Sequence, residues 1–297
     1  MGKKIRSISV YRSKVDGSSS GDDQGILMSR EVFHPDFDKT VLQEQYGIDG
    51  QLEQTTVFEY DDRGFLIREV LKEADGTVTE EKSFEPDDRQ RIAREYLHYA
   101  DGSHDTIHYT YDDSGRVIRR EIIDSDGDIE EISEMAYQDD QLVHELVKDA
   151  DGEIVDEHRY VYEDGLLQEV FHYNGQEESS QKRVYSYNDE GHRESVLVYD
   201  NDDNLIERFL FENDDQGRPI QIIEENRQKK NTIHMKYANH GHVGFQEEYD
   251  MKGNLVSRVE RVYDDDGLLL ESRIDATVPA MGVQQSYVVK QQYAFFD

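Results

Sequence analysis

A short motif returns about every 25 residues along this chain of 297 residues, and no other feature constrains the fold as strongly. The motif reads Tyr-Asp-Asp-x-Gly, or a close variant, and continues with aliphatic residues. Its clearest copies begin at Tyr60, Tyr111, Tyr162, Tyr187 and Tyr263. A fixed period in this range is typical of a repeat architecture, in which each unit packs only on its neighbours. The repeated residues are turn and packing residues, so they specify a shape rather than a chemistry.

Each unit contains two turn signals separated by strand-like segments. In the first turn, Asp favours the start of a type I turn and Gly accepts the left-handed conformation that closes a hairpin. The second turn contains Asp-Gly or Asn-Gly, at residues 75–76, 101–102, 126–127, 151–152 and 174–175. Between the turns lie runs of roughly eight residues rich in Val, Ile, Tyr and Phe, which have the length and composition of β-strands.

We therefore predict an all-β fold of about nine to ten tandem β-hairpin repeats, with roughly 18–20 antiparallel strands in one long sheet. Open twisted sheets rarely exceed about ten strands, so this sheet should coil into a spiral, a shell or a wide barrel. The repeat array is predicted over residues 31–275. Residues 1–30 should supply an N-terminal strand and a flexible loop at 15–25, and residues 276–297 a capping strand or a plug.

Acidic residues dominate the composition. The formal net charge is −34, and residues 1–14 contain five cations and no acid, so the rest of the chain carries −39. Such a field repels nucleic acid and anionic membranes and attracts cationic partners. We expect a basic protein as partner, and neither nucleic acid nor a membrane; the oligomeric state stays open. A solvated acidic surface, adaptation to high salt and mimicry of nucleic acid would each produce the same charge.

Several classes of protein are excluded by what the sequence lacks. It has no cysteine, which excludes disulfide bonds, thiolate metal sites and cysteine nucleophiles. The basic N-terminus lacks the apolar run of a secretory signal, and no segment approaches the roughly 18 apolar residues that span a membrane. These features predict a cytoplasmic protein, with export by a dedicated secretion system as the alternative.

Paired aromatic residues mark many of the predicted strands. Because side chains alternate between the faces of a strand, residues two apart share a face and would align as an aromatic stripe across neighbouring strands. The stripe is interpreted either as a buried packing face or as a ligand-binding surface. The residues assigned to the candidate binding surface are Tyr60, Tyr109, Tyr111, Tyr160, Tyr162, Tyr185 and Tyr187.

One acidic turn is a weak candidate for a metal site. Asp124, Asp126 and Asp128 alternate around a glycine, and alternating acids of this kind can surround Ca²⁺. The spacing departs from that of an EF-hand loop, and the segment occupies a second-turn position. A structural turn is therefore the main interpretation, and no cofactor is expected.

Histidines cluster around one predicted hairpin. A hairpin folded at residues 101–102 would pair His98 with Asp105. His104 and His108 would then share one face of the hairpin, and His98 would lie on the other. Three convergent ligands are unavailable from such a hairpin, so we expect no metal site there.

Two segments resemble the Tyr-x-Tyr-Asp-x-x-Gly-x-Leu pattern of the RHS/YD-repeat family: His108-Tyr-Thr-Tyr-Asp-Asp-Ser-Gly-Arg-Val117 and Arg159-Tyr-Val-Tyr-Glu-Asp-Gly-Leu-Leu167. The resemblance covers residues 33–270 and fits short bacterial proteins with YD-like β-hairpin repeats better than the large members of the family. It implies a long spiralling sheet, often a shell around a cargo polypeptide. Many large members are surface proteins or toxins, whereas this chain shows neither an obvious toxin domain nor a self-cleavage motif.

These observations predict a non-catalytic repeat scaffold or binding protein that acts through an acidic surface and an aromatic stripe and holds a client polypeptide. The sequence contains no nucleophile elbow and no phosphate-binding loop, and a repeat distributes similar residues evenly where an active site needs one exceptional place. We therefore expect no enzymatic activity. The alternative is a toxin-system component, either a secreted effector or an immunity protein that neutralises a basic partner; a carbohydrate-active enzyme is a remote alternative.

Overall fold

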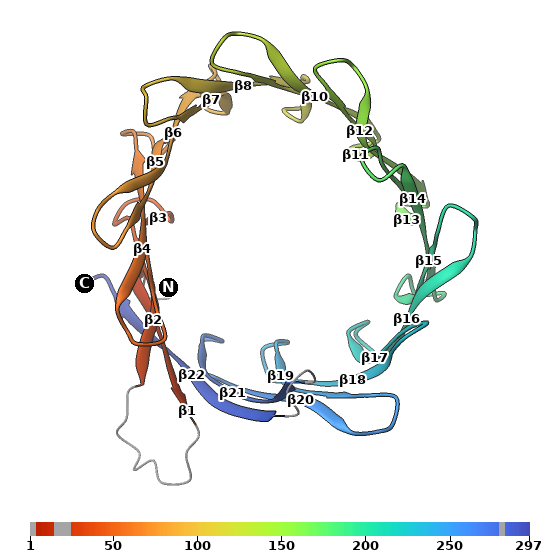
Figure 1. Ribbon diagram of the computed structural model, residues 1–297. Helices are drawn as coiled ribbons and strands as arrows, with labels where there is room; N and C mark the ends of the chain where they lie inside the picture. The colour runs from red at the N-terminus through yellow and green to blue at the C-terminus, as the bar shows by residue number, and fades with distance from the viewer. Residues whose placement is uncertain (1–3, 15–24, 279–282) are drawn as a thin grey trace. The chain divides into compact units, whose positions relative to one another are not determined.

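The computed structural model describes residues 4–14, 25–278 and 283–297, in which the regular secondary structure consists of 22 β-strands (Figure 1). The prediction of an all-β, antiparallel fold is confirmed. The strand number exceeds the roughly 18–20 predicted from the repeats, because β1 and β22 come from outside the repeat segment. How the sheet coils over its full length stays a prediction. The predicted loop at 15–25 lies outside the described residues, apart from Gly25.

The chain divides into two units, residues 1–81 with 232–297, and residues 82–231. The strands, in chain order, are β1 (Ile5–Lys14), β2 (Ile26–Phe33), β3 (Thr40–Tyr46), β4 (Leu52–Tyr60), β5 (Leu66–Glu73), β6 (Val78–Pro86), β7 (Ile92–His98), β8 (His104–Tyr111), β9 (Val117–Ile123), β10 (Ile129–Gln138), β11 (Gln141–Asp149), β12 (Ile154–Glu163), β13 (Leu166–Asn174), β14 (Ser179–Tyr187), β15 (Arg193–Tyr199), β16 (Leu205–Asn213), β17 (Pro219–Asn226), β18 (Lys230–Tyr237), β19 (Val243–Tyr249), β20 (Leu255–Tyr263), β21 (Leu269–Val278) and β22 (Val283–Phe295).

In the first unit, the two ends of the chain meet in one sheet. Its strand order is β5-β4-β3-β2-β1-β22-β21-β20-β19-β18, and every neighbouring pair is antiparallel. The red β1 and the dark-blue β22 lie side by side in Figure 1. The C-terminal segment thus forms a strand that is paired on both sides, with β1 and with β21.

In the second unit, strands β7 to β17 pair in chain order, each antiparallel to the next. Most of these pairs contain a one-residue register shift, which is the mark of a β-bulge. A bulge matters for any site on the sheet, because a one-residue shift moves a side chain to the opposite face relative to its partners.

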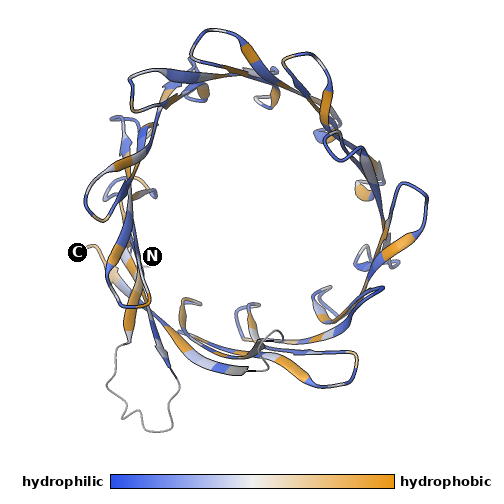
Figure 2. Cartoon of the chain, in the orientation of Figure 1, coloured by the Kyte–Doolittle hydropathy of each residue, from blue (hydrophilic) through white to orange (hydrophobic). Residues whose placement is uncertain are grey.

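Few side chains of the described residues are fully buried. The strands of each unit form a single layer, and hydrophobic residues are short segments between hydrophilic ones (Figures 1 and 2). Among the described residues, the buried apolar side chains are Phe65, Val70, Val196 and Val198. Stability must therefore come largely from ladder hydrogen bonds and cross-strand side-chain pairs. The described ranges contain no helix long and apolar enough to cross a membrane.

At most of their copies, both turn signals fold into the same three-residue loop. In a first turn, the N–H of Gly115 donates to the carbonyl of Asp112 at 3.0 Å. In a second turn, Gly127 donates to Asp124 in the same way at 3.1 Å. Both glycines have positive φ, 88° and 93°, so the repeated Gly meets a conformational requirement at each position. Where Gly is missing, another residue takes its place, as Gln90 does with a φ of 63°.

Candidate functional site

The aspartate that begins a first turn, such as Asp112, stabilises the turn itself. Asp112 Oδ1 accepts the N–H of Arg116 at 2.9 Å, and Arg116 Nε donates to Oδ2 at 2.7 Å. The main-chain N–H of Arg116 is the main cause that holds the pKa of Asp112 below its ordinary value. Asp87 and Asp214 have the same arrangement. The main cause of their lowered pKa is a hydrogen bond from an arginine side chain, from Arg91 to Asp87 and from Arg218 to Asp214.

A neighbouring acid in the same turns points to solvent. The first turns of the second unit lie at the same end of its strands, and we call this line of turns the first-turn edge and the line at the other end the second-turn edge. Six consecutive first turns each carry an exposed aspartate, and we call these residues the acidic row: Asp88, Asp113, Asp139, Asp164, Asp189 and Asp215. Successive first turns are separated by two strands, which corresponds to about 10 Å along the edge. The row therefore presents negative charge at a regular spacing.

The motif tyrosine links one first turn to the next. The Tyr111 hydroxyl donates to the carbonyl of Ile92 at 2.8 Å, and the guanidinium of Arg91 lies 4.0 Å from the centre of the Tyr111 ring. Burial is the main cause that raises the pKa of Tyr111. Tyr60 and Tyr187 make the equivalent main-chain bonds, each at 2.7 Å. Three of the candidate binding tyrosines thus use their hydroxyls to hold neighbouring strands together.

The other four candidate tyrosines are half-buried side chains of the second unit. Tyr109 donates to Glu95 Oε2 at 3.1 Å, and burial is the main cause of its raised pKa. Tyr160 and Tyr162 lie on β12, whereas Tyr185 lies on β14, so β13 separates them. The aromatic stripe follows the repeat across strands rather than gathering into one pocket, and its role in binding stays a prediction.

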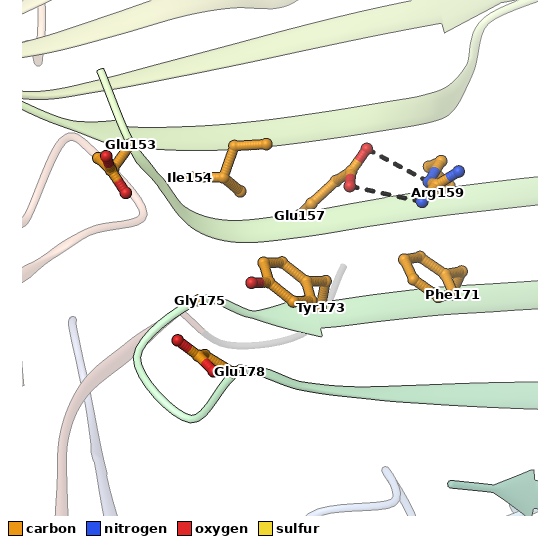
Figure 3. Close-up of a pocket in the computed structure, with 8 residues that line it drawn as sticks. All are labelled: Glu153, Ile154, Glu157, Arg159, Phe171, Tyr173, Gly175 and Glu178. Carbon is orange, nitrogen blue, oxygen red and sulfur yellow. Dashed lines mark hydrogen bonds and ion pairs between the residues drawn. The ribbon is translucent and has the colours of Figure 1, made fainter. Parts of the chain in front are cut away.

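A shallow depression of about 460 Å³ lies over β12, β13 and the turn that follows β13 (Figure 3). Its lining residues are Glu153, Ile154, Glu157, Arg159, Phe171, Tyr173, Gly175 and Glu178. Figure 3 shows the two aromatic rings along β13 and the Glu178 carboxylate on the turn below them. An aromatic floor beside carboxylates suits a cationic side chain or another small cationic group.

Two of the ionic groups in the depression, Glu157 and Arg159, already contact each other. Arg159 Nε lies 3.2 Å from Glu157 Oε1, and the Arg159 guanidinium lies 4.3 Å from the centre of the Phe171 ring. His144 Nε2 approaches Glu157 Oε1 from β11 at 2.9 Å. These residues escaped prediction from the sequence because they become neighbours only through strand pairing. The turn at Asp164 and Gly165 is the signal that could have suggested the hairpin.

The calcium candidate has the geometry of an ordinary second turn. Asp124 Oδ1 accepts the main-chain N–H groups of Asp126 and Asp128, each at 2.9 Å. Asp126 and Asp128 are exposed. The Asp124 carboxylate therefore stabilises its second turn by accepting main-chain N–H groups, as Asp112 does in a first turn.

The predicted register of the histidine hairpin is wrong. His98 pairs with His104 and not with Asp105, because the hairpin closes with a three-residue loop in which the N–H of Tyr99 donates to the carbonyl of Ser103 at 2.9 Å. His98 and His104 consequently share one face, and their ring centres are 5.8 Å apart. The expectation that they lie on opposite faces is corrected by this one-residue shift.

Comparison with known proteins assigns no family to the chain. No family model matches it, and no curated protein matches it either. Among solved structures, the chain is similar to one in the crystal structure of TcdB2-TccC3-Cdc42, with 11% identity and a TM-score of 0.47, covering 97% of this chain and 19% of that chain. The Photorhabdus luminescens Tc holotoxin pore gives 10% identity and a TM-score of 0.38, covering 93% of this chain and 20% of that chain.

A third similar structure is a porin-like protein from Bacteroides uniformis, with 11% identity and a TM-score of 0.35, covering 98% of this chain and 96% of that chain. The chain spans about a fifth of the length of the two toxin chains. All three TM-scores lie below 0.5, and these likenesses carry no conclusion about function. The resemblance to RHS/YD repeats stays a prediction from the sequence.

Proposed function

We propose that the chain is a non-catalytic binding protein that holds a basic polypeptide along its acidic row. The observation that carries this proposal is the exposed aspartate in each of six consecutive first turns of the second unit. The net charge of −34 adds a long-range field that would attract such a partner. A scaffold for a client polypeptide and an immunity protein for a basic toxin would both use this surface, and they differ in the identity of the partner.

The turns hold the acidic row in a fixed arrangement. In four of the six turns the first side chain is bound within its own turn, as Asp112 is by Arg116 and Asn188 is by the N–H of His192, and motif tyrosines such as Tyr111 tie neighbouring strands together. A surface that is ordered before binding loses less conformational entropy when a partner docks. Each exposed ion pair contributes only about 0.2–1 kcal/mol, so binding requires several of them at once.

The spacing of the row suits an extended chain. Turns about 10 Å apart match every third residue of a polyproline II chain, which advances about 3.1 Å per residue and returns every third side chain to the same side. A partner with Lys or Arg at every third position could contact successive aspartates without bending. Because the pairs are exposed, raising the salt concentration should weaken the complex strongly.

The test compares two variants of equal charge by fluorescence anisotropy, with a labelled peptide that carries Lys at every third position. The row variant replaces four acids at the first-turn edge with Asn: Asp88, Asp113, Asp189 and Asp215. The control variant replaces four exposed acids at the second-turn edge with the matching amides: Asp126, Asp151, Glu177 and Asp202.

We expect the row variant to lose about tenfold or more in affinity, since four exposed pairs are removed. The control variant should retain affinity within about twofold, because its net charge is the same but its row is intact. Equal losses of affinity in the two variants would show that net charge alone determines binding, and this would contradict the proposal. Absence of binding to the native chain at low salt would contradict it as well.

A further inference from the structure

Among residues 4–14, 25–278 and 283–297, one group brings three ligand-type side chains together: Asp156, His158 and His172. His158 Nδ1 lies 2.9 Å from Asp156 Oδ1, and His172 Nε2 lies 2.7 Å from Asp156 Oδ2. One ligand atom from each residue lies within 4.8 Å of the others. Asp156 and His158 alternate with Glu157 and Arg159 along β12, and His172 alternates with Phe171 and Tyr173 along β13, so the cluster lies on the face opposite the depression.

A β-bulge places the two histidines on the same face. The turn at residues 164–165 alone would set Glu163 opposite Leu166 and carry that register along the hairpin. The register instead shifts between Val161 and Tyr162, and His158 pairs directly with His172. Directly opposite residues on neighbouring strands have Cβ atoms about 4.5–5.5 Å apart, which is suitable for sharing one ion.

The cluster contains a polar atom that its neighbours do not satisfy. His158 Nδ1 is shielded from solvent and makes no hydrogen bond of acceptable geometry, although Asp156 Oδ1 is only 2.9 Å away. The two imidazole rings are stacked, with centres 4.2 Å apart and planes 8° apart. A buried ring nitrogen without a directed partner is an open ligand position.

The geometry points to a binding site for a divalent first-row transition metal, with Zn²⁺ as the best fit. Two imidazoles and one carboxylate form a donor set that suits Zn²⁺, whereas Ca²⁺ prefers oxygen ligands alone. Bonds of about 2.0–2.2 Å in a tetrahedral site put ligand atoms about 3.3–3.6 Å apart. The distances from Asp156 to the two imidazoles, 2.9 and 2.7 Å, would therefore lengthen by less than about 1 Å. Glu145 pairs with His158 from β11 and is placed to supply a fourth ligand or to hold a metal-bound water.

The site is accessible to an ion from solution. The side chains of Asp156, His158 and His172 are 31%, 29% and 35% exposed. A polypeptide bound along the acidic row would not require this site, so the inference is independent of the proposed function.

Isothermal titration calorimetry on the full chain, without a histidine tag, tests the site with Zn²⁺ and with Ca²⁺. The variants are His158→Gln and His172→Gln, and the matched control is His144→Gln, which removes a histidine that contacts a carboxylate on the opposite face. Visible absorption of the Co²⁺-loaded chain reports the coordination geometry directly.

We expect one equivalent of Zn²⁺ to bind the native chain, with at least tenfold weaker binding in each site variant and no change in the control. The Co²⁺ spectrum should show tetrahedral coordination that both site variants lose. Absence of Zn²⁺ binding, equal binding in all three variants, or equal affinity for Ca²⁺ would overturn the proposal. Circular dichroism identifies any variant that fails to fold, and Asp156→Asn then takes its place.

Discussion

Most turns at the two edges of the second unit are three-residue loops of the same backbone geometry, but their surroundings differ. At the first-turn edge, a Cβ added to Gly217 would lie 2.3 Å from the ring of His192, and one added to Gly115 would lie 3.5 Å from Arg91. At the second-turn edge, a Cβ on Gly127 would meet nothing within 4 Å. Each edge has one exception: Gly165, in a two-residue turn at the first-turn edge, has open space around it, and a Cβ on Gly175 at the second-turn edge would meet the carbonyl of Ile154.

Contacts between successive turns account for this difference. Arg89 donates to the carbonyl of Asp113 at 3.1 Å, and Arg116 donates to Asp140 Oδ1 at 2.7 Å. Both contacts join first turns that are 24 residues apart. The first-turn edge is therefore held together along its length, and its turns present the acidic row. At the second-turn edge, three-residue loops such as the one at Gly127 depend mainly on their own hydrogen bonds, whereas the turn at Gly175 donates its N–H to the carbonyl of Val155 at 2.8 Å.

The largest expected difference between the edges comes from replacing a turn glycine. Gly217→Ala should destabilise the chain by about 3 kcal/mol, because the left-handed conformation costs about 1–2 kcal/mol and the new methyl also displaces His192. Gly127→Ala should cost only the conformational part, about 1–2 kcal/mol. Urea unfolding measures the free energy of unfolding of both variants. Equal losses of stability would show that the first-turn edge is no more tightly packed than the second-turn edge.

Loss of a single hydroxyl should have a smaller effect. Tyr111→Phe removes the bond to the carbonyl of Ile92 and should cost about 1 kcal/mol, because that acceptor loses its side-chain partner. Tyr173→Phe in the depression is the control and should change stability by less than about 0.5 kcal/mol. Thermal or urea unfolding of the two variants would contradict the account if Tyr173→Phe were the more damaging.

Introducing glycine should stabilise the chain, and more so at the first-turn edge. Gln90 has a φ of 63° and a shielded Oε1 without a hydrogen bond, so Gln90→Gly should add about 1 kcal/mol. Asp203, at 58° in a second turn, accepts from Lys182 at 2.9 Å, and Asp203→Gly loses that bond. The gain at this position should therefore be smaller. A loss of stability in Gln90→Gly, measured by urea unfolding, would refute the assignment of strain to this turn.

Lowering the pH should gradually destabilise the first turns. The pKa of Asp112 is lowered from 3.8 in the folded chain, so its contribution to stability is present above that value and is lost as the pH falls through the lowered pKa. Asp112→Asn should therefore flatten the dependence of the urea midpoint on pH below about 4. Asp113→Asn changes the charge equally without removing the turn bond, and it serves as the control. Identical pH profiles for the two variants would contradict this role of Asp112.

Local signals made much of this fold predictable, whereas pairing across strands did not follow from them. Asp and Gly at fixed offsets determine the turns, and the runs between them become the strands. The partners of a strand residue depend on loop length and on bulges, which the sequence signals weakly. One extra loop residue brought His98 opposite His104, and one bulge brought His158 opposite His172. The contacts between first turns likewise join residues 24 positions apart.

The central claim is that the first-turn edge presents acids at the spacing of two strands to a basic partner. The most direct test measures the affinity of the native chain for three peptides of identical composition, with Lys at every second position, at every third position, or in one block. The account predicts the tightest binding for Lys at every third position, because three residues of a polyproline II chain advance about 9 Å and bring the side chain back to the same side. Equal affinities for the three peptides would contradict it, because net charge alone would then be sufficient for the binding.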